Sequence, residues 1–145
     1  NMKTLKHENI KTSPKLFIEK YQTTGGTEYF LSFEDKDRIA VFAFLRLRIP
    51  EKTGQSELYE ALPEIKDCAF IRELHTYGQL VNIGKDEKEA SQHKGMGKKL
   101  LKKAEQIARQ NDYKKIAVIS GIGVRDYYRK NGYGKIGTYM IKSLT

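Results

Sequence analysis

The first half of the chain alternates between apolar and polar positions with the two-residue period of β-strands. Residues 15–21 and 28–33 both alternate in this way and carry aromatic strand formers, and Gly25-Gly26 lies between them. Two such runs on either side of a Gly-Gly turn predict a β-hairpin. A longer alternating run over residues 39–49 predicts a third strand, which ends at a proline.

A fourth strand is expected over residues 68–81. It follows residues 50–67, which contain two prolines and a glycine and are expected to form a loop with one helical turn. Strict alternation in the fourth strand predicts one face that carries Ala69, Ile71, Glu73, His75 and Tyr77.

After Gly97 the apolar positions change to helical spacing, with lysines between them: Leu100, Leu101, Ala104, Ile107 and Ala108. Asn111-Asp112 is expected to end this helix. An apolar strand buried on both faces is predicted over residues 116–119, a second helix over 124–130 and a closing strand over 133–141. This order predicts one α+β domain, a three-layer α/β arrangement whose mixed, mostly antiparallel central sheet is flanked by helices.

Length and charge narrow the possible functions. The chain has 145 residues, enough for one domain, and 27 Lys and Arg residues against 18 Asp and Glu residues give a net charge of +9. This balance indicates an anionic partner, nucleic acid or a phosphorylated cofactor, or simply serves solubility. No apolar run approaches the roughly 18 residues that cross a membrane, so we expect no membrane partner.

The cysteine count and the start of the chain give further expectations. Cys68 is the single cysteine, which excludes an internal disulfide and a thiolate metal cluster and is consistent with a cytoplasmic protein. Asn1 precedes Met2 without an apolar signal core, so we interpret residues 1–14 as a lead-in with a tag remnant and 15–145 as the folded part of a longer protein.

The segment before the first helix has the composition of a phosphate-binding turn: Gln92-His93-Lys94-Gly95-Met96-Gly97-Lys98-Lys99. Two glycines let the backbone approach a ligand closely, and the first helical turn offers free N–H groups and the positive end of the helix dipole. A pyrophosphate fits such a place. The alternative is an ordinary loop that enters a helix. The spacing matches neither a Walker A loop nor the dinucleotide fingerprint.

Gln-x-x-Gly-x-Gly at the start of a helix resembles the acetyl-CoA signature of the GNAT acyltransferases. Downstream, the segment from Tyr127-Tyr128 to Gly132-Tyr133 resembles the Tyr-x-x-x-Gly-Phe/Tyr segment of that superfamily, with Tyr128 four residues before the glycine. The resemblance implies a GNAT-like fold and acetyl-CoA as cosubstrate.

A narrower resemblance is to the C-terminal GNAT-type acetyltransferase domain of the Elongator catalytic subunit, an archaeal-like tRNA uridine-modifying (carboxymethyluridine synthase) family. It covers residues 15–141 in blocks that include Gly25-Gly26-Thr27-Glu28, Ile71-Arg72-Glu73-Leu74-His75 and the run from Ser120 to Tyr128. The family implies modification of carbon five of the wobble uridine in tRNA. It also implies a radical S-adenosylmethionine domain with an iron–sulfur cluster, which one cysteine cannot ligate.

The same resemblance implies roles for the residues of the turn and of the second helix. The expected cofactor-binding residues are Gln92, His93, Lys94, Gly95, Met96, Gly97, Lys98, Tyr127 and Tyr128. Tyr128 is the expected proton donor to the departing CoA thiolate, or positions the sulfur. We expect Tyr127 to pack mainly in the core.

Glu73 and His75 are further catalytic candidates, because either side chain can act as a base or polarise water beside the expected thioester. The alternatives are an ion pair of Glu73 with Arg72 or Arg125 and a hydrogen-bonded core histidine at His75. Cys68 is expected to pack as a small apolar residue.

Five basic residues are candidates for contacts to tRNA phosphates: Arg46, Arg48, Lys99, Lys102 and Lys103. The alternative is a solvated basic surface. Two other functions stay open, a lysine acetyltransferase that acts on protein tails and a non-catalytic module that binds tRNA and acetyl-CoA. The positive charge disfavours the acidic groove that a basic tail needs.

Overall fold

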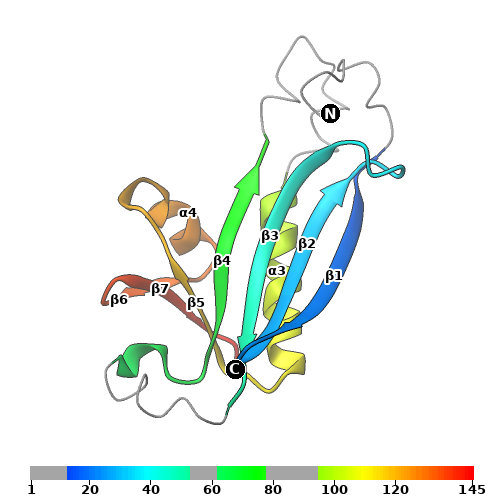
Figure 1. Ribbon diagram of the computed structural model, residues 1–145. Coiled ribbons are helices and arrows are strands. Elements are labelled where there is room, and N and C mark those ends of the chain that lie inside the picture. Colours follow the sequence, from blue (N-terminus) through cyan, green and yellow to red (C-terminus); the bar gives the residue numbers. More distant parts are fainter. Residues whose placement is uncertain (1–12, 53–61, 78–94) are drawn as a thin grey trace.

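The computed structural model describes residues 13–52, 62–77 and 95–145. These residues form a seven-stranded sheet with the order β1-β2-β3-β4-β5-β7-β6 (Figure 1). The pairings are antiparallel except for β4 with β5, so the predicted mixed, mostly antiparallel sheet is confirmed. The strands are β1 Lys15–Thr23, β2 Gly26–Glu34, β3 Val41–Pro50, β4 Cys68–Thr76, β5 Lys115–Ile119, β6 Gly134–Ile136 and β7 Tyr139–Ser143.

The predicted hairpin is confirmed as β1 and β2, joined at Gly25-Gly26. Gly25 has a φ of 80°, which favours glycine. A Cβ at Gly26 would lie 2.6 Å from the main-chain oxygen of Ile49, so β3 passes too close for a side chain. Both glycines are therefore required by the local geometry.

The strands β4 and β5 diverge along their length. They pair in parallel from Cys68 with Lys115 to Ile71 with Val118, and β4 then continues to Thr76 with β3 as its partner. On the β5 side, the main chain of β4 beyond Ile71 has no strand partner among the described residues. The sheet opens there, as Figure 1 shows between β4 and β5.

A bulge at Arg72 changes the face on which the β4 side chains lie. Arg46 of β3 pairs with Glu73, and the next residue, Leu47, pairs with Ile71, so Arg72 is an extra residue. The prediction that Glu73 and His75 share a face with Ala69 and Ile71 is therefore wrong. Beyond the bulge, Leu74 packs on the core instead.

The helix α3, Met96–Gln110, covers one face of the sheet and buries the predicted apolar positions against it. It ends at the C-cap Asn111, as predicted. The second helix, α4 Arg125–Lys130, follows a 3₁₀ turn, Ile122–Val124, and another 3₁₀ turn covers Pro63–Ile65.

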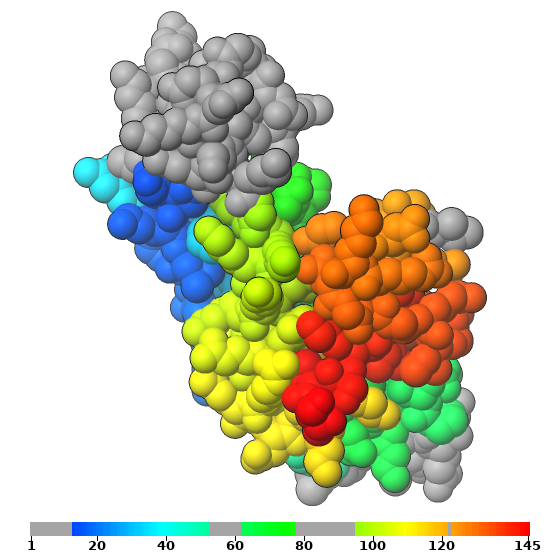
Figure 2. All heavy atoms as spheres, turned by 180° about the vertical axis from the view of Figure 1, so that it is seen from behind, coloured from blue at the N-terminus to red at the C-terminus, as the bar shows by residue number. Residues whose placement is uncertain are grey.

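Both α helices lie on the same side of the sheet. Tyr128 of α4 joins the core cluster that α3 builds, and Figure 2 shows both helices from behind the sheet. No described helix covers the other face of β1–β4, which is called the outer face below. The three-layer arrangement is therefore not seen within the described residues.

Two details near the end of the chain differ from prediction. The closing strand is a hairpin of β6 and β7, because Gly137 at a φ of 61° turns the chain between them. In β5, Ile116 to Val118 are buried as predicted, but Ile119 is 71% exposed, since β4 has already diverged beside it.

Candidate functional site

The first turn of α3 is a set of main-chain donors without a side-chain cap. Gly95 occupies the N-cap with a φ of 80°, and as a glycine it has no side chain that could accept a hydrogen bond from the helix start. The first hydrogen bond into the helix runs from the N–H of Lys99 to the carbonyl of Gly95 at 3.0 Å. The preceding N–H groups therefore have no acceptor within the helix. The first helical turn has no acidic residue. The main-chain N–H groups, the positive end of the helix dipole and the charge of Lys98 therefore all favour the binding of an anion.

Three elements meet at Gly97. A Cβ built on this glycine would lie 2.7 Å from Oη of Tyr127 in α4 and 3.4 Å from Cγ2 of Thr76 at the end of β4. Gly97 is thus the position where the helix start approaches both the divergent end of β4 and a tyrosine hydroxyl. Burial raises the pKa of Tyr127, so its hydroxyl stays protonated and able to donate a hydrogen bond.

The two adjacent tyrosines of α4 have different environments. Tyr128 is 6% exposed and lies in the main core cluster, with its ring 5.6 Å from that of Tyr133. Tyr127 is 38% exposed, so the expectation that it packs mainly in the core is wrong. Burial, with a smaller effect of Tyr127, raises the pKa of Tyr128 to about 12. Its hydroxyl has no hydrogen-bond partner among the described residues, which leaves its proton available.

Glu73 and His75 lie on the outer face of β4, away from α3. Glu73 forms a loose ion pair with Arg46 at 3.9 Å, and both side chains are about half exposed. The ring of His75 lies 5.8 Å from that of Phe44 and 4.4 Å from that of Tyr77. The expected alternatives, an ion pair of Glu73 with Arg72 or Arg125 and a core histidine, are not what the structure shows.

The predicted cofactor-binding residues are partly described. Gly95, Met96, Gly97 and Lys98 begin α3, and the two tyrosines of α4 lie beside it. Gln92, His93 and Lys94 lie outside the described residues, so their roles remain predictions. Cys68 is fully buried among apolar neighbours, as predicted, and burial raises the pKa of its thiol to about 11.

The predicted phosphate-contacting residues lie on two sides of the sheet. Arg46 and Arg48 are on the outer face, whereas Lys99, Lys102 and Lys103 are on α3, which covers the opposite face. Arg48 is also held internally, since its guanidinium donates to Glu28 Oε2 at 2.6 Å and to the hairpin turn. The five residues therefore do not form one patch.

Sequence reasoning missed Arg72 and Thr76. Arg72 forms the bulge, and its guanidinium lies 3.4 Å from the carboxylate of Glu28. Thr76 lies beside Gly97, where β4 meets the start of α3. Neither position carries a local signal, because both roles depend on how β4 pairs with β3 and meets α3.

Comparisons with known proteins agree with this geometry. Residues 88–142 match the family model described as an acetyltransferase (GNAT) domain. A tRNA uridine(34) acetyltransferase of Methanocaldococcus jannaschii is 48% identical over 90% of this chain and 23% of its own length. Elongator complex protein 3 of Bos taurus is 44% identical over 86% of this chain and 22% of its own. The solved structure of Methanocaldococcus infernus Elp3 with an N-terminal deletion superposes with a TM-score of 0.68, at 42% identity over 90% of this chain and 30% of that one.

The diverging parallel strands β4 and β5, together with helix α3 that follows a glycine N-cap, identify the GNAT class of acetyltransferases. The predicted fold is therefore confirmed. Within that class, the chain belongs to the acetyltransferase domains of the Elongator complex protein 3 family. It spans about a quarter of the length of the curated relatives it matches.

The fold implies acetyl-CoA as cosubstrate, and the residues present fit it. The uncapped donors at the start of α3 suit the diphosphate, and the absence of a Cβ at Gly97 lets Tyr127 and Thr76 lie close to them. When bound, acetyl-CoA supplies the activated acetyl group. In the part of the chain that the structure describes, no helix is long and apolar enough to cross a membrane.

Proposed function

We propose that this domain binds acetyl-CoA and cleaves its thioester for the modification of carbon five of the wobble uridine in tRNA. The name tRNA uridine(34) acetyltransferase, given to relatives at 48% and 47% identity, supports this assignment. The single cysteine cannot hold an iron–sulfur cluster, so this domain contributes the acyl chemistry alone. A radical S-adenosylmethionine domain in a longer cytoplasmic protein would complete the reaction.

The observation that carries the proposal is the meeting of α3, β4 and Tyr127 around Gly97. Main-chain N–H groups of the helix start would bind the diphosphate, with Lys98 adding charge. Beyond Ile71, the unpartnered edge of β4 offers main-chain donors and acceptors to the amide-bearing arm of the cosubstrate. The thioester then lies in the opening between β4 and β5.

Tyr128 acts on the sulfur in this proposal. With a pKa of about 12, its phenol remains protonated at neutral pH. Full proton transfer to a thiolate with a pKa of about 8.5 would be uphill by about 3.5 pKa units, or about 5 kcal/mol. Tyr128 therefore serves by holding its proton in a hydrogen bond to the sulfur, which spreads the developing charge without completing the transfer.

The acceptor side is the outer face of β4 in this proposal. Glu73 and His75 lie there, separated from α3 by the sheet itself. Both side chains are exposed, and Glu73 is held only loosely by Arg46, so either can hold or accept a proton from water or from the acceptor. Tyr128 and the acceptor would then reach the thioester from opposite faces of the sheet.

The test is thioester cleavage of acetyl-CoA with tRNA, without tRNA and with a basic peptide, in wild type, Tyr128→Phe and Tyr127→Phe. We expect tRNA to stimulate cleavage and Tyr128→Phe to lower kcat by about tenfold to a hundredfold, since one transition-state hydrogen bond is lost. Tyr127→Phe should raise KM for acetyl-CoA instead. Peptide acetylation that outpaces tRNA-stimulated cleavage would favour a protein lysine acetyltransferase. Intact cleavage in Tyr128→Phe would remove this residue from the chemistry.

A further inference from the structure

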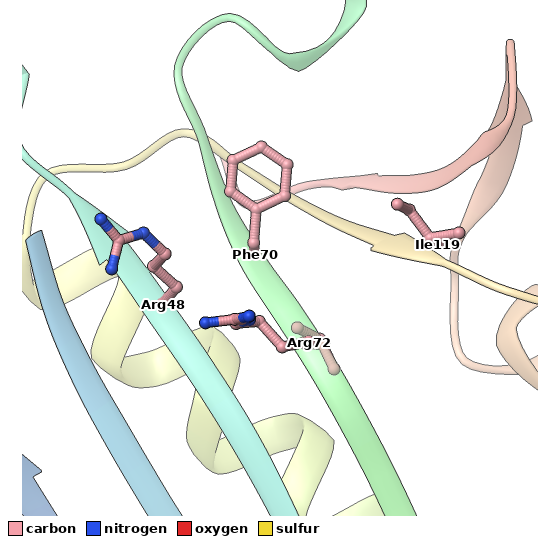
Figure 3. A pocket seen from close by; sticks show the side chains of 5 residues that line it. Arg48, Phe70, Arg72 and Ile119 are labelled. Atoms are coloured by element: carbon pink, nitrogen blue, oxygen red, sulfur yellow. The ribbon is translucent and has the colours of Figure 1, made fainter. Parts of the chain in front are cut away.

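The outer face carries a depression that the acetyl-CoA site does not use. It has a volume of about 260 Å³ and is lined by Arg48, Phe70, Ile71, Arg72 and Ile119. Figure 3 shows both arginines, Phe70 and Ile119 on the side of the sheet that faces away from α3. The sheet therefore separates this depression from the first turn of α3.

Arg72 is the more weakly held cation of this depression. Its side chain is 61% exposed, and within the described residues its one ion pair is the 3.4 Å approach of Nη1 to Glu28. Arg48 already neutralises that same carboxylate at 2.6 Å. Two guanidinium groups thus face one carboxylate, and the depression keeps a net positive charge with unused Arg72 donors. An arginine fork with free N–H groups is suited to a phosphate.

Apolar surface lies next to this charge. Phe70 is half buried, with its ring edge-on to Tyr139 at 6.4 Å, and it borders the depression beside Arg72. Ile119 is 71% exposed, although it is a large aliphatic residue at the end of a buried strand. An aromatic ring beside an exposed aliphatic side chain and a free guanidinium is suited to a planar ring that carries a phosphate.

We propose that this depression is a subsite for one nucleotide of an RNA, with the base against Phe70 and Ile119 and a phosphate at Arg72. Two observations favour RNA: the chain carries a net charge of +9, and within the described residues Arg72 makes one weak ion pair, so it keeps donors for a phosphate. The subsite rests on the proposed function, since it lies on the same outer face of β4 as Glu73 and His75.

The same chemistry exists in the nucleotide part of acetyl-CoA, so the test must separate the two sources. The probes are a short RNA hairpin with unpaired uridines in its loop, measured by fluorescence anisotropy, and acetyl-CoA, measured by calorimetry. The variants are Arg72→Gln and Phe70→Leu, with Arg129→Gln as the matched control. Arg129 is similarly exposed, but it lies on α4, on the other side of the sheet, and does not line the depression.

We expect Arg72→Gln to weaken RNA binding about tenfold and to reduce the salt slope by about one, because one phosphate contact is lost. Phe70→Leu should weaken binding about fivefold with an unchanged salt slope, since stacking is lost but no charge. Arg129→Gln should change affinity less than twofold, because this residue lies on the other side of the sheet. Acetyl-CoA should bind all three variants like wild type.

Several outcomes overturn the subsite. If Arg129→Gln weakens RNA binding as much as Arg72→Gln, the effect comes from general surface charge. If acetyl-CoA binding falls in Arg72→Gln, the depression holds the nucleotide of the cosubstrate. If neither Arg72→Gln nor Phe70→Leu changes RNA binding, the depression does not bind RNA. Arg72 is exposed, so Arg72→Gln should fold even if Phe70→Leu does not. RNA binding that depends on Arg72 without any thioester cleavage would retain the subsite and reject the proposed function.

Discussion

The substitution Gly97→Ala separates ligand binding from stability at the start of α3. The new Cβ would lie 2.7 Å from Oη of Tyr127, which is about 0.7 Å inside ordinary contact, and at ordinary contact distance from Cγ2 of Thr76. The clash falls on the far end of a half-exposed side chain, which can swing toward solvent at a cost of about 1 kcal/mol. Alanine stabilises the helix by about 0.5–1 kcal/mol relative to glycine. The free energy of unfolding should therefore change by less than about 1 kcal/mol.

Binding of acetyl-CoA should respond very differently to Gly97→Ala. The methyl group would displace the Tyr127 hydroxyl from beside the helix start, where we propose that the diphosphate binds, and each charge-assisted hydrogen bond lost to a phosphate costs about 1.5–3 kcal/mol. The dissociation constant should rise by about tenfold to a hundredfold. Calorimetric titration measures the affinity and thermal denaturation the stability. Gly134→Ala is the control, since a Cβ there meets no atom within 4 Å. Unchanged affinity with unchanged stability would refute the reasoning.

Four further outcomes follow from the packing. Cys68 is fully buried with a pKa of about 11, so iodoacetamide should modify it only after unfolding; modification of the native chain would contradict its burial. The partly buried ammonium of Lys142 lies 3.0 Å from the carboxylate of Glu105, and Glu105→Ala leaves it without its counter-ion. This substitution should lower the free energy of unfolding by about 3 kcal/mol in urea titrations. A loss below about 1 kcal/mol would mean that water replaces the ion pair. Gly26→Ala should cost about 2–3 kcal/mol in the same assay, and a neutral result would mean that the hairpin shifts freely. The pKa of Tyr128, about 12, exceeds the ordinary value near 10, so the folded chain holds this proton longer than the unfolded chain. Stability should therefore fall between about pH 10 and 12, less steeply in Tyr128→Phe, and an identical fall in both would contradict the assignment.

Much of the fold could be predicted because its signals are local. The hairpin at Gly25-Gly26 follows from alternation and a turn that accepts positive φ, and α3 follows from apolar residues at helical spacing. The start of α3, where we predict phosphate binding, was predictable for the same reason, since it is set by consecutive residues around Gly95 and Gly97.

The errors arise where distant parts of the chain decide the geometry. The bulge at Arg72 comes from register with β3, and it moves Glu73 and His75 to the outer face although their spacing in the sequence is unchanged. Tyr127 and Tyr128 are neighbours on a six-residue helix, so periodicity could not tell which one is buried. The ion pairs that hold Arg48 likewise depend on contacts across the sheet.

The most direct test of the central claim is an amide NMR titration of the ¹⁵N-labelled chain with acetyl-CoA. The claim is that the start of α3 binds the diphosphate, so the N–H resonances of Gly97, Lys98 and Lys99 should shift most. In Gly97→Ala the same shifts should need about tenfold to a hundredfold more acetyl-CoA. Shifts confined to the outer face, around Arg72, with an unchanged spectrum at the start of α3, would contradict it.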